Sequence, residues 1–280
     1  MNVVVVTPTL GTSPWLAETV ASVAALPLAV THVLVAPPGA AAALVTRFPR
    51  ALVMAERTPG RGMYAAINAG LAAVPGWDAF TYLNDDDLLL PRFATAVARA
   101  AGGGGGGRRW LIYGRVRLID ARGRRMGAIP VSPWPALNRE LYAQRFEPVY
   151  QHGTLVARGA WEQQGGFDEA WRFCGDSEYL ARLCMAGIPA FRVRGEVAAF
   201  RLHPGQLTKN RAVMVAERAR VDEKLGLLAW RHPWRRAWAR LLFRAANLPV
   251  YAERVARHGW ISFDELLVRG GASSPDHPQS

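Results

Sequence analysis

Residues 81–90 read TYLNDDDLLL, so three consecutive aspartates stand between two apolar runs. Adjacent carboxylates repel one another, and grouping them costs free energy unless a cation or solvent offsets the repulsion. The apolar segment DAFTYL (78–83) predicts a buried strand, which places Asp85, Asp86 and Asp87 at its carboxyl end. Ligands of open α/β sheets bind there, and Mg²⁺ or Mn²⁺ prefers carboxylate oxygens. We therefore expect a divalent cation and a diphosphate at this cluster; a solvated acidic turn is the alternative.

Strand and helix patterns alternate around this cluster. The apolar, β-branched runs NVVVVTPTL (2–10), THVLVAPPG (31–39) and ALVMAER (51–57) predict strands. Apolar residues recur at helical spacing in SPWLAETVASVAAL (13–26) and GMYAAINAGLAAV (62–74), which predicts two helices. This rhythm predicts an α/β fold with a Rossmann-like, mostly parallel sheet covered by helices.

The second half of the chain is expected to complete this domain and to add a helical extension. Strand patterns recur at 110–120, 150–158 and 189–203, a helix is expected over 175–187, and the glycine run 102–107 predicts a loop. From residue 212 the sequence changes to arginine-rich helical segments with tryptophans. We therefore expect an α/β domain over residues 1–210, a basic, aromatic-rich helical extension over 211–270 and a disordered tail over 271–280.

Composition narrows the classes of function. Half of the 280 residues are hydrophobic, which favours a sizeable core, and no apolar run is long enough to cross a membrane. The opening MNVVVVTPTLG lacks signal-peptide features, and Cys174 and Cys184 lack metal-ligand spacing, so a cytoplasmic protein with reduced thiols is expected. The net charge of +12 is compatible with nucleic acid, anionic lipid or phosphorylated substrates as partners, or with solubility alone.

A glycine-containing turn precedes the second predicted helix in TPGRGMYAAINAG (58–70). Gly60 and Gly62 would let the backbone approach a ligand closely, and the helix N-terminus favours an anion. Arg61 would add a charge-assisted contact. Asn68, further along the helix, would either reach the crevice or lie in solvent. An ordinary helix entry is the alternative for this segment.

Two later segments carry further candidates. In GGFDEAWRFCGDSEYLARL (165–183), Asp176 stands at the start of a predicted helix, either as a general base or as an N-cap that satisfies backbone N–H groups. In FRLHPGQLT (200–208), His203 follows a strand and precedes a Pro-Gly turn. It is a candidate metal ligand or phosphate contact, with a purely structural histidine as the alternative.

The order and spacing of these segments resemble the family-2 glycosyltransferases with the GT-A fold, over roughly residues 1–210. The matching features are VVVVTPTLG, GRGMYAAINAG, NDDD, GGFDE and GDSEYLARL before FRLH. The resemblance implies that Asp85, Asp86 and Asp87 form the DxD motif, which binds Mn²⁺ or Mg²⁺ and the donor diphosphate, with Asp87 as the direct ligand. It implies that Asp176 is the catalytic base of an inverting transfer.

The sequence departs from this family pattern at positions that contact the nucleobase. Ala36-Pro37-Pro38-Gly39 stands where relatives commonly carry an aspartate, and Gly60 and Ala65 stand where relatives often show two more. We therefore expect base recognition to rest on backbone groups near Thr7 and Thr9, and to be weak. An unusual donor is the alternative. A degenerate, inactive member of the family is a further alternative, against which the retained aspartate cluster and Asp176 argue.

The resemblance implies a nucleotide-sugar donor and a saccharide or lipid-linked acceptor, in bacterial surface polysaccharide or glycolipid synthesis. A nucleotidyltransferase of similar α/β fold and a basic nucleic-acid-binding protein are the alternatives. No nucleic-acid partner is expected, because the basic stretches lie mostly after residue 210, away from the motifs.

The segment HPWRRAWARLLFRAANLPVY (232–251) predicts an amphipathic helix with arginines at the sides and back of an apolar face. Such a helix suits an anionic membrane surface, and we expect peripheral association at the inner face of the plasma membrane. Packing of this face on the α/β domain, or a dimer contact, is the alternative. The apolar face comprises Trp234, Ala237, Trp238, Leu241 and Ala245.

Overall fold

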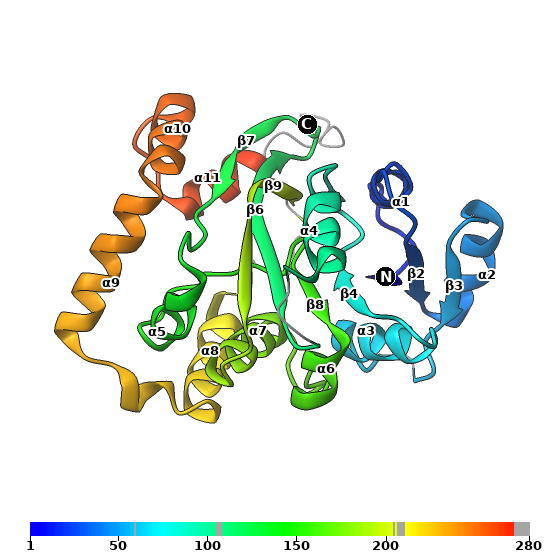
Figure 1. Cartoon of the computed structure of the whole chain (residues 1–280). Coiled ribbons are helices and arrows are strands. Elements are labelled where there is room, and N and C mark those ends of the chain that lie inside the picture. Colours follow the sequence, from blue (N-terminus) through cyan, green and yellow to red (C-terminus); the bar gives the residue numbers. More distant parts are fainter. Residues whose placement is uncertain (59, 105–107, 204, 206–210, 272–280) are drawn as a thin grey trace.

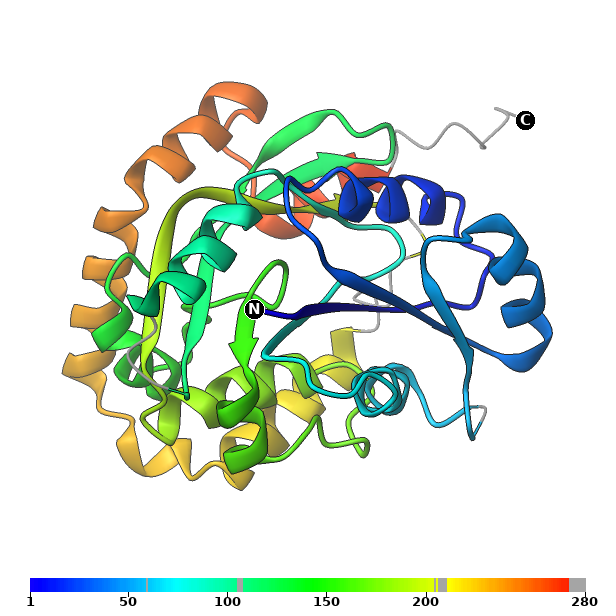
Figure 2. The same cartoon turned by 45° about the vertical axis from the view of Figure 1, so that its right-hand side comes forward.

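The computed structural model describes residues 1–58, 60–104, 108–203, 205 and 211–271 (Figures 1 and 2). Apart from Gly271, the expected disordered tail lies outside these residues, as does the second half of the glycine run. The first half of that run, predicted as a loop, is described as part of a π-helical turn, Ala100–Gly104, which is kinked at Gly103.

Nine strands form one sheet within the described residues, in the order β3-β2-β1-β4-β8-β6-β9-β5, with β7 paired to β6. The run β3-β2-β1-β4 is parallel throughout, β6 and β9 are parallel, and the remaining pairs are antiparallel. The expected α/β fold with a mostly parallel sheet is confirmed. The strands are β1 (Val3–Pro8), β2 (Thr31–Ala36), β3 (Leu52–Ala55), β4 (Ala79–Tyr82), β5 (Leu88–Leu89), β6 (Leu111–Asp120), β7 (Arg125–Ile129), β8 (Leu155–Ala157) and β9 (Ala190–Leu202).

Helices cover both faces of this sheet (Figure 2). Those at 16–24, 63–72 and 175–185 fall in predicted helices, whereas α2, α4, α5 and α6 were not predicted. The helices are α1 (Leu16–Ala24), α2 (Pro38–Arg47), α3 (Met63–Ala72), α4 (Phe93–Arg99), α5 (Asn138–Ala143), α6 (Arg158–Gln164), α7 (Gly175–Met185), α8 (Arg211–Lys224), α9 (Pro233–Ala246), α10 (Leu248–His258) and α11 (Phe263–Gly271), with 3₁₀ turns at Pro135–Leu137 and Leu227–Trp230.

The continuous valine run of β1 follows from burial on both faces. Val4 and Val6 pack in the core beneath α3 and α7, whereas Val3 and Val5 pack in the core on the opposite face. A strand with one solvated face would alternate apolar and polar residues. The run therefore places β1 at the centre of the sheet, and its carboxyl end next to that of β4.

The C-terminal helices fold back onto the α/β domain. Glu217 of α8 accepts hydrogen bonds from the backbone N–H groups of residues 172–174, at 2.8 to 2.9 Å, and so fixes the segment before α7. Leu266 of α11 packs against Val116 and Leu202 of the sheet. Figure 1 shows α9 along the left edge of the molecule. No helix in the described part of the chain has the length and apolar character needed to span a bilayer. The domain boundary at residue 210 stays a prediction.

Candidate functional site

The carboxyl ends of β1 and β4 bring Thr9 next to Asp85. The Thr9 hydroxyl donates a hydrogen bond to Asp85 Oδ2 at 2.6 Å, and the Ser13 hydroxyl donates to the Asp85 carbonyl at 2.9 Å. Burial raises the pKa of Asp85 to about 6, against the opposing effect of the Thr9 hydrogen bond. Asp85 is therefore held in place beside the first strand, as an acidic group that titrates near neutrality.

Asp86 faces His203, which comes from the end of β9. Asp86 Oδ2 lies 2.7 Å from His203 Nε2, and the imidazole lies against the Trp15 ring with centroids 4.4 Å apart. The second oxygen, Asp86 Oδ1, is buried without a hydrogen-bond partner among the described residues. Burial and the neighbouring Asp87 charge raise the pKa of Asp86. A buried carboxylate oxygen without a donor, beside an imidazole, fits a hard divalent cation.

Asp87 is fully buried, so the alternative of a solvated acidic turn is wrong for this residue. Its Oδ1 accepts the Arg201 backbone N–H at 2.9 Å, and its Oδ2 accepts the Asn84 amide at 3.0 Å. The cause is β5, which begins directly after Asp87 and pairs with β9, drawing the chain back into the sheet. Both oxygens are occupied by structural contacts.

Arg201 on β9 has a fully buried side chain that braces the acidic segment. Its Nε donates to the Asp86 carbonyl at 2.8 Å, and its Nη2 pairs with Glu18 of α1 at 2.7 Å. This guanidinium therefore places a positive charge against Glu18 and fixes the backbone of the acidic segment at Asp86. Arg201 was not predicted as a site residue, and its one signal in the sequence is an arginine inside the apolar run VAAFRL.

Asp176 lies in the first turn of α7, and Cys174 occupies the N-cap position without a side-chain capping bond. The interpretation of Asp176 as an N-cap is therefore wrong. Its Oδ1 accepts the Ser177 N–H at 2.7 Å, and its own N–H donates to the Tyr64 hydroxyl oxygen at 3.1 Å. A Cβ at Gly175 would lie 2.5 Å from the Tyr64 ring, so glycine is required for this close approach. Burial, followed by the Glu147 charge, raises the pKa of Asp176 to about 6.

Two residues that the sequence analysis missed connect Asp176 to its surroundings. Glu147 accepts a hydrogen bond from the Ser177 hydroxyl at 2.8 Å and forms an ion pair with Arg218 of α8. His152 Nε2 lies 3.3 Å from Asp87 Oδ2, and its charge would lower the pKa of Asp176. His152 thus lies between the acidic cluster and Asp176. Neither Glu147 nor His152 belongs to a sequence motif whose spacing would identify it as a site residue.

The predicted turn before α3 has the expected backbone but different contacts. Gly60 and Gly62 adopt φ values of 84° and 94°, which favour glycine. Arg61, exposed at 60%, pairs with Glu169 at 3.1 Å. Asn68 lies in neither predicted environment, because its amide donates to the Phe167 carbonyl at 2.8 Å and accepts the Phe167 N–H at 3.0 Å. This residue holds the GGFDE segment in place.

The structure brings Thr9, Asp85, Asp86 and His203 together, whereas Thr7 lies behind them. The Thr7 side chain is fully buried and bonds His32 at 3.0 Å. Thr7 also lies within the β1–β2 pairing, and the Thr9 N–H donates to the Val35 carbonyl at 2.9 Å. The expected recognition of a nucleobase through these backbone groups stays a prediction.

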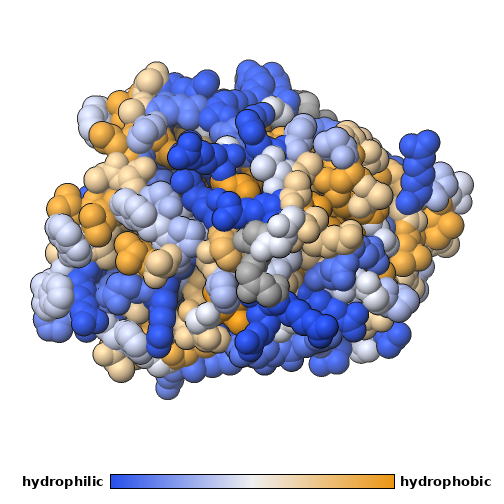
Figure 3. Space-filling model, in the orientation of Figure 1, coloured by the Kyte–Doolittle hydropathy of each residue, from blue (hydrophilic) through white to orange (hydrophobic). Residues whose placement is uncertain are grey.

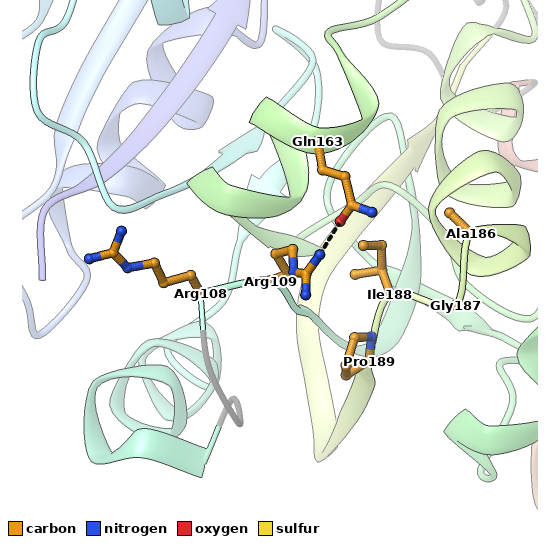
Figure 4. Close-up of a pocket in the computed structure, with 7 residues that line it drawn as sticks. All are labelled: Arg108, Arg109, Gln163, Ala186, Gly187, Ile188 and Pro189. Carbon is orange, nitrogen blue, oxygen red and sulfur yellow. Dashed lines mark hydrogen bonds between the residues drawn. The ribbon is translucent and has the colours of Figure 1, made fainter.

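A separate cavity of about 300 Å³ opens at the other end of α7 (Figure 4). Arg109 donates to Gln163 there at 3.1 Å, while Arg108 points away from the other residues that Figure 4 labels. Ala186 and Gly187 follow the last residue of α7, so this cavity lies roughly 16 Å along the helix from Asp176. It is not part of the candidate site.

No family model and no curated protein matches this sequence. Solved structures share its fold. S. aureus TarS 1–349, in complex with UDP-GlcNAc, aligns over 96% of this chain and 79% of its own, with a TM-score of 0.63 and 12% identity. The mannosyltransferase PcManGT from Pyrobaculum calidifontis, in complex with GDP-Man and Mn²⁺, aligns over 96% and 85%, with a TM-score of 0.54 and 16% identity. At such identities the likeness establishes the fold.

Proposed function

We propose that this protein is an inverting glycosyltransferase, which moves a sugar from a nucleotide-sugar donor to an acceptor hydroxyl. The observation that carries the proposal is the pairing of Asp86, with its unpartnered buried oxygen, and His203 at the carboxyl end of β4. Asp176 supplies a second acidic group with a raised pKa. The glycosyltransferase neighbours with bound nucleotide-sugars support this choice among the chemistries of an α/β fold.

We propose Asp86 and His203 as the protein ligands of a divalent cation. We propose that Asp85, beside them, contacts the nucleotide-sugar donor. Asp87, our first choice from the sequence, is a weaker candidate because both of its oxygens accept structural hydrogen bonds. Among the described residues no group of three or more acidic, histidine or cysteine side chains is arranged to hold a metal ion by itself, so donor phosphates and water would complete the coordination. Mn²⁺ or Mg²⁺, when bound, would offset negative charge on the departing nucleoside diphosphate.

Asp176 is proposed as the general base. Its carboxylate takes the proton from the acceptor hydroxyl as that oxygen forms a bond to the anomeric carbon. The bond between the anomeric carbon and the donor diphosphate breaks on the opposite side, which inverts the anomeric centre. A pKa near 6 leaves the group mostly ionised at pH 7 yet more basic than an ordinary aspartate, as a general base needs.

We also propose that α9 contacts an anionic membrane surface, at the cytoplasmic face of the plasma membrane. All five residues of the predicted apolar face are exposed, with Trp234 at 60% and Trp238 at 56%. The opposite side of α9, with Ala239 and Phe243, packs against Leu141. The alternative in which the tryptophan face packs on the α/β domain is therefore wrong. Figure 3 shows hydrophobic and hydrophilic patches side by side along this edge.

A thermal-shift panel tests the proposed donor class. UDP- and GDP-sugars should raise the melting temperature in the presence of Mn²⁺ and much less with EDTA, because a ligand that binds the folded state stabilises it by mass action. The Asp86→Ala variant should lose the Mn²⁺-dependent part of the shift. A panel without any nucleotide-dependent shift would contradict the proposal.

A further inference from the structure

A cavity of about 540 Å³ lies between the α/β domain and the C-terminal helices, apart from the acidic cluster. Its volume is that of a small-molecule site. The α5 end, α8, α9 and α10 form its walls, and Figure 1 shows these elements around the left half of the molecule. The lining residues are Ile129, Pro130, Arg145, Phe146, Glu147, Tyr150, Arg218, Arg236, Phe243, Tyr251 and Arg254.

The cavity carries more positive than negative charge. Four arginines line it, against the single carboxylate of Glu147, which Arg218 already neutralises. Arg145 pairs with buried Asp222 at 2.9 Å. Arg236 on α9 has no side-chain hydrogen bond or ion pair within the described chain, so its guanidinium is available for an incoming anion.

The backbone beneath this cavity is strained at an arginine. The Phe146 N–H donates to the Leu141 carbonyl and the Arg145 N–H to the Tyr142 carbonyl, which is the hydrogen-bond pattern of a Schellman helix end. Arg145 occupies the left-handed position with a φ of 67°, where glycine is usual; among described residues no other non-glycine has a positive φ. An arginine side chain thus lines the cavity from a backbone position where residues other than glycine have a conformational cost.

The walls are preorganised. Asn247, between α9 and α10, accepts the Val131 N–H at 3.2 Å and donates to the Val131 carbonyl at 3.1 Å. This clamp fixes both helices against the end of β7. The Phe146 and Phe243 rings lie with centroids 5.6 Å apart and planes tilted by 34°, and they offer an apolar wall for the carbon skeleton of a ligand.

One lining residue of the cavity, Glu147, is hydrogen-bonded to the helix turn that carries the proposed catalytic base. Glu147 lines the cavity and accepts a hydrogen bond from the hydroxyl of Ser177, the residue that follows Asp176. A molecule that fills the cavity therefore contacts Glu147, whose other partners include the residue that follows the proposed base.

We propose that this cavity binds a phosphate ester carried by the acceptor, so that the acceptor is a phosphorylated polyol, saccharide or lipid. Guanidinium groups on separate helices can contact a tetrahedral phosphate from several sides, whereas a planar carboxylate engages one guanidinium fork. The volume exceeds that of a lone phosphate, and the aromatic wall accounts for the rest of the ligand. The acceptor role rests on the proposed glycosyl transfer.

Calorimetric titration without added metal tests the cavity itself, because it measures binding and needs no turnover. The probe is glycerophosphoglycerol, a soluble phosphodiester, with glucuronate as the carboxylate control and glycerol as the neutral control. Wild type should bind the phosphodiester in preference to both controls, with and without excess UDP. The Arg236→Gln and Arg254→Gln variants should each weaken binding at least about tenfold, through loss of a charge-assisted contact.

Arg240→Gln is the matched control, because Arg240 is exposed on the same helix and does not line the cavity. Equal binding by Arg236→Gln and Arg240→Gln, equal binding of glucuronate, or no binding by wild type would overturn the proposal. Correct probe binding without any nucleotide-sugar turnover would leave the phosphate site standing and remove the proposed function. Nucleotide-sugar turnover without probe binding would support the proposed function and overturn the phosphate site.

Vesicles of phosphatidylglycerol, compared with phosphatidylcholine, identify the source of the phosphate. If Arg236→Gln weakens binding to anionic vesicles as strongly as it weakens binding of glycerophosphoglycerol, the ligand of the cavity is a lipid headgroup. Vesicle binding that this variant leaves unchanged, alongside lost binding of the soluble probe, assigns it to a soluble phosphodiester acceptor.

Discussion

Replacing Asp176 with asparagine should lower turnover and raise the stability of the fold. The variant should lose turnover by roughly 10²- to 10⁴-fold, the usual contribution of a general base. The same change should stabilise the fold at pH 7, because burial raises the pKa of Asp176 from 3.8 to about 6 and so disfavours the ionised form in the folded state. The difference of about two units corresponds to an upper bound of about 3 kcal/mol.

The sign of this effect follows from linkage. A carboxyl whose pKa is higher in the folded than in the unfolded state binds protons more tightly when folded. Its stabilising proton is fully present below the unfolded pKa and is lost as pH rises through about 6. The advantage of Asp176→Asn should therefore shrink from about 3 kcal/mol at pH 7 to about 1.5 kcal/mol at pH 5.

Two assays test this prediction. Urea unfolding of both proteins between pH 5 and pH 7 gives the free energy of unfolding, and donor turnover over the same range gives the rate. Wild-type turnover should fall as pH drops through about 6, because the base becomes protonated. Normal turnover by Asp176→Asn would refute the catalytic role, and a loss of stability at pH 7 would refute the argument from burial.

Three further predictions concern the acidic cluster, the nucleobase and the membrane. Asp87→Ala should lower the free energy of unfolding by at least about 2 kcal/mol, because it leaves the Asn84 amide and the Arg201 backbone N–H without their acceptor. Asp86→Ala should not lower it in this way. Urea unfolding compares the two variants, and equal stability would contradict the structural role of Asp87. Preference between uridine and other bases should stay below about a hundredfold, or about 2.7 kcal/mol, in a competition of nucleotide-sugars, and a stronger preference contradicts the expectation. Replacing Trp234 and Trp238 with serine should abolish salt-sensitive flotation with anionic vesicles, and unchanged flotation contradicts the proposed contact.

Local patterns in the sequence were sufficient for the parallel half of the sheet. The valine run of β1 and the apolar segment before the aspartates each encode burial on both faces, and the structure has strands at both. The burial of Asp87 was not predictable in this way. It depends on the pairing of β5 with β9, which joins residues more than a hundred positions apart.

The same limit applies to side chains with distant partners. Helical spacing identified the apolar face of α9, but only the packing of Phe243 reveals which side of the helix faces the protein. Asn68 was a candidate ligand because of its position on α3, and its actual partners lie about a hundred residues away. Glu147 and His152 carry no local signal, because their role arises from proximity to Asp176.

Product analysis tests the central claim most directly. Wild-type protein incubated with Mn²⁺, a nucleotide-sugar and a phosphorylated polyol acceptor should release the nucleoside diphosphate and form a glycoside of inverted anomeric configuration. The Asp176→Asn protein should still bind the donor yet release the diphosphate at least about a hundredfold more slowly. Release of pyrophosphate in place of a nucleoside diphosphate would indicate nucleotidyl transfer and would contradict the account.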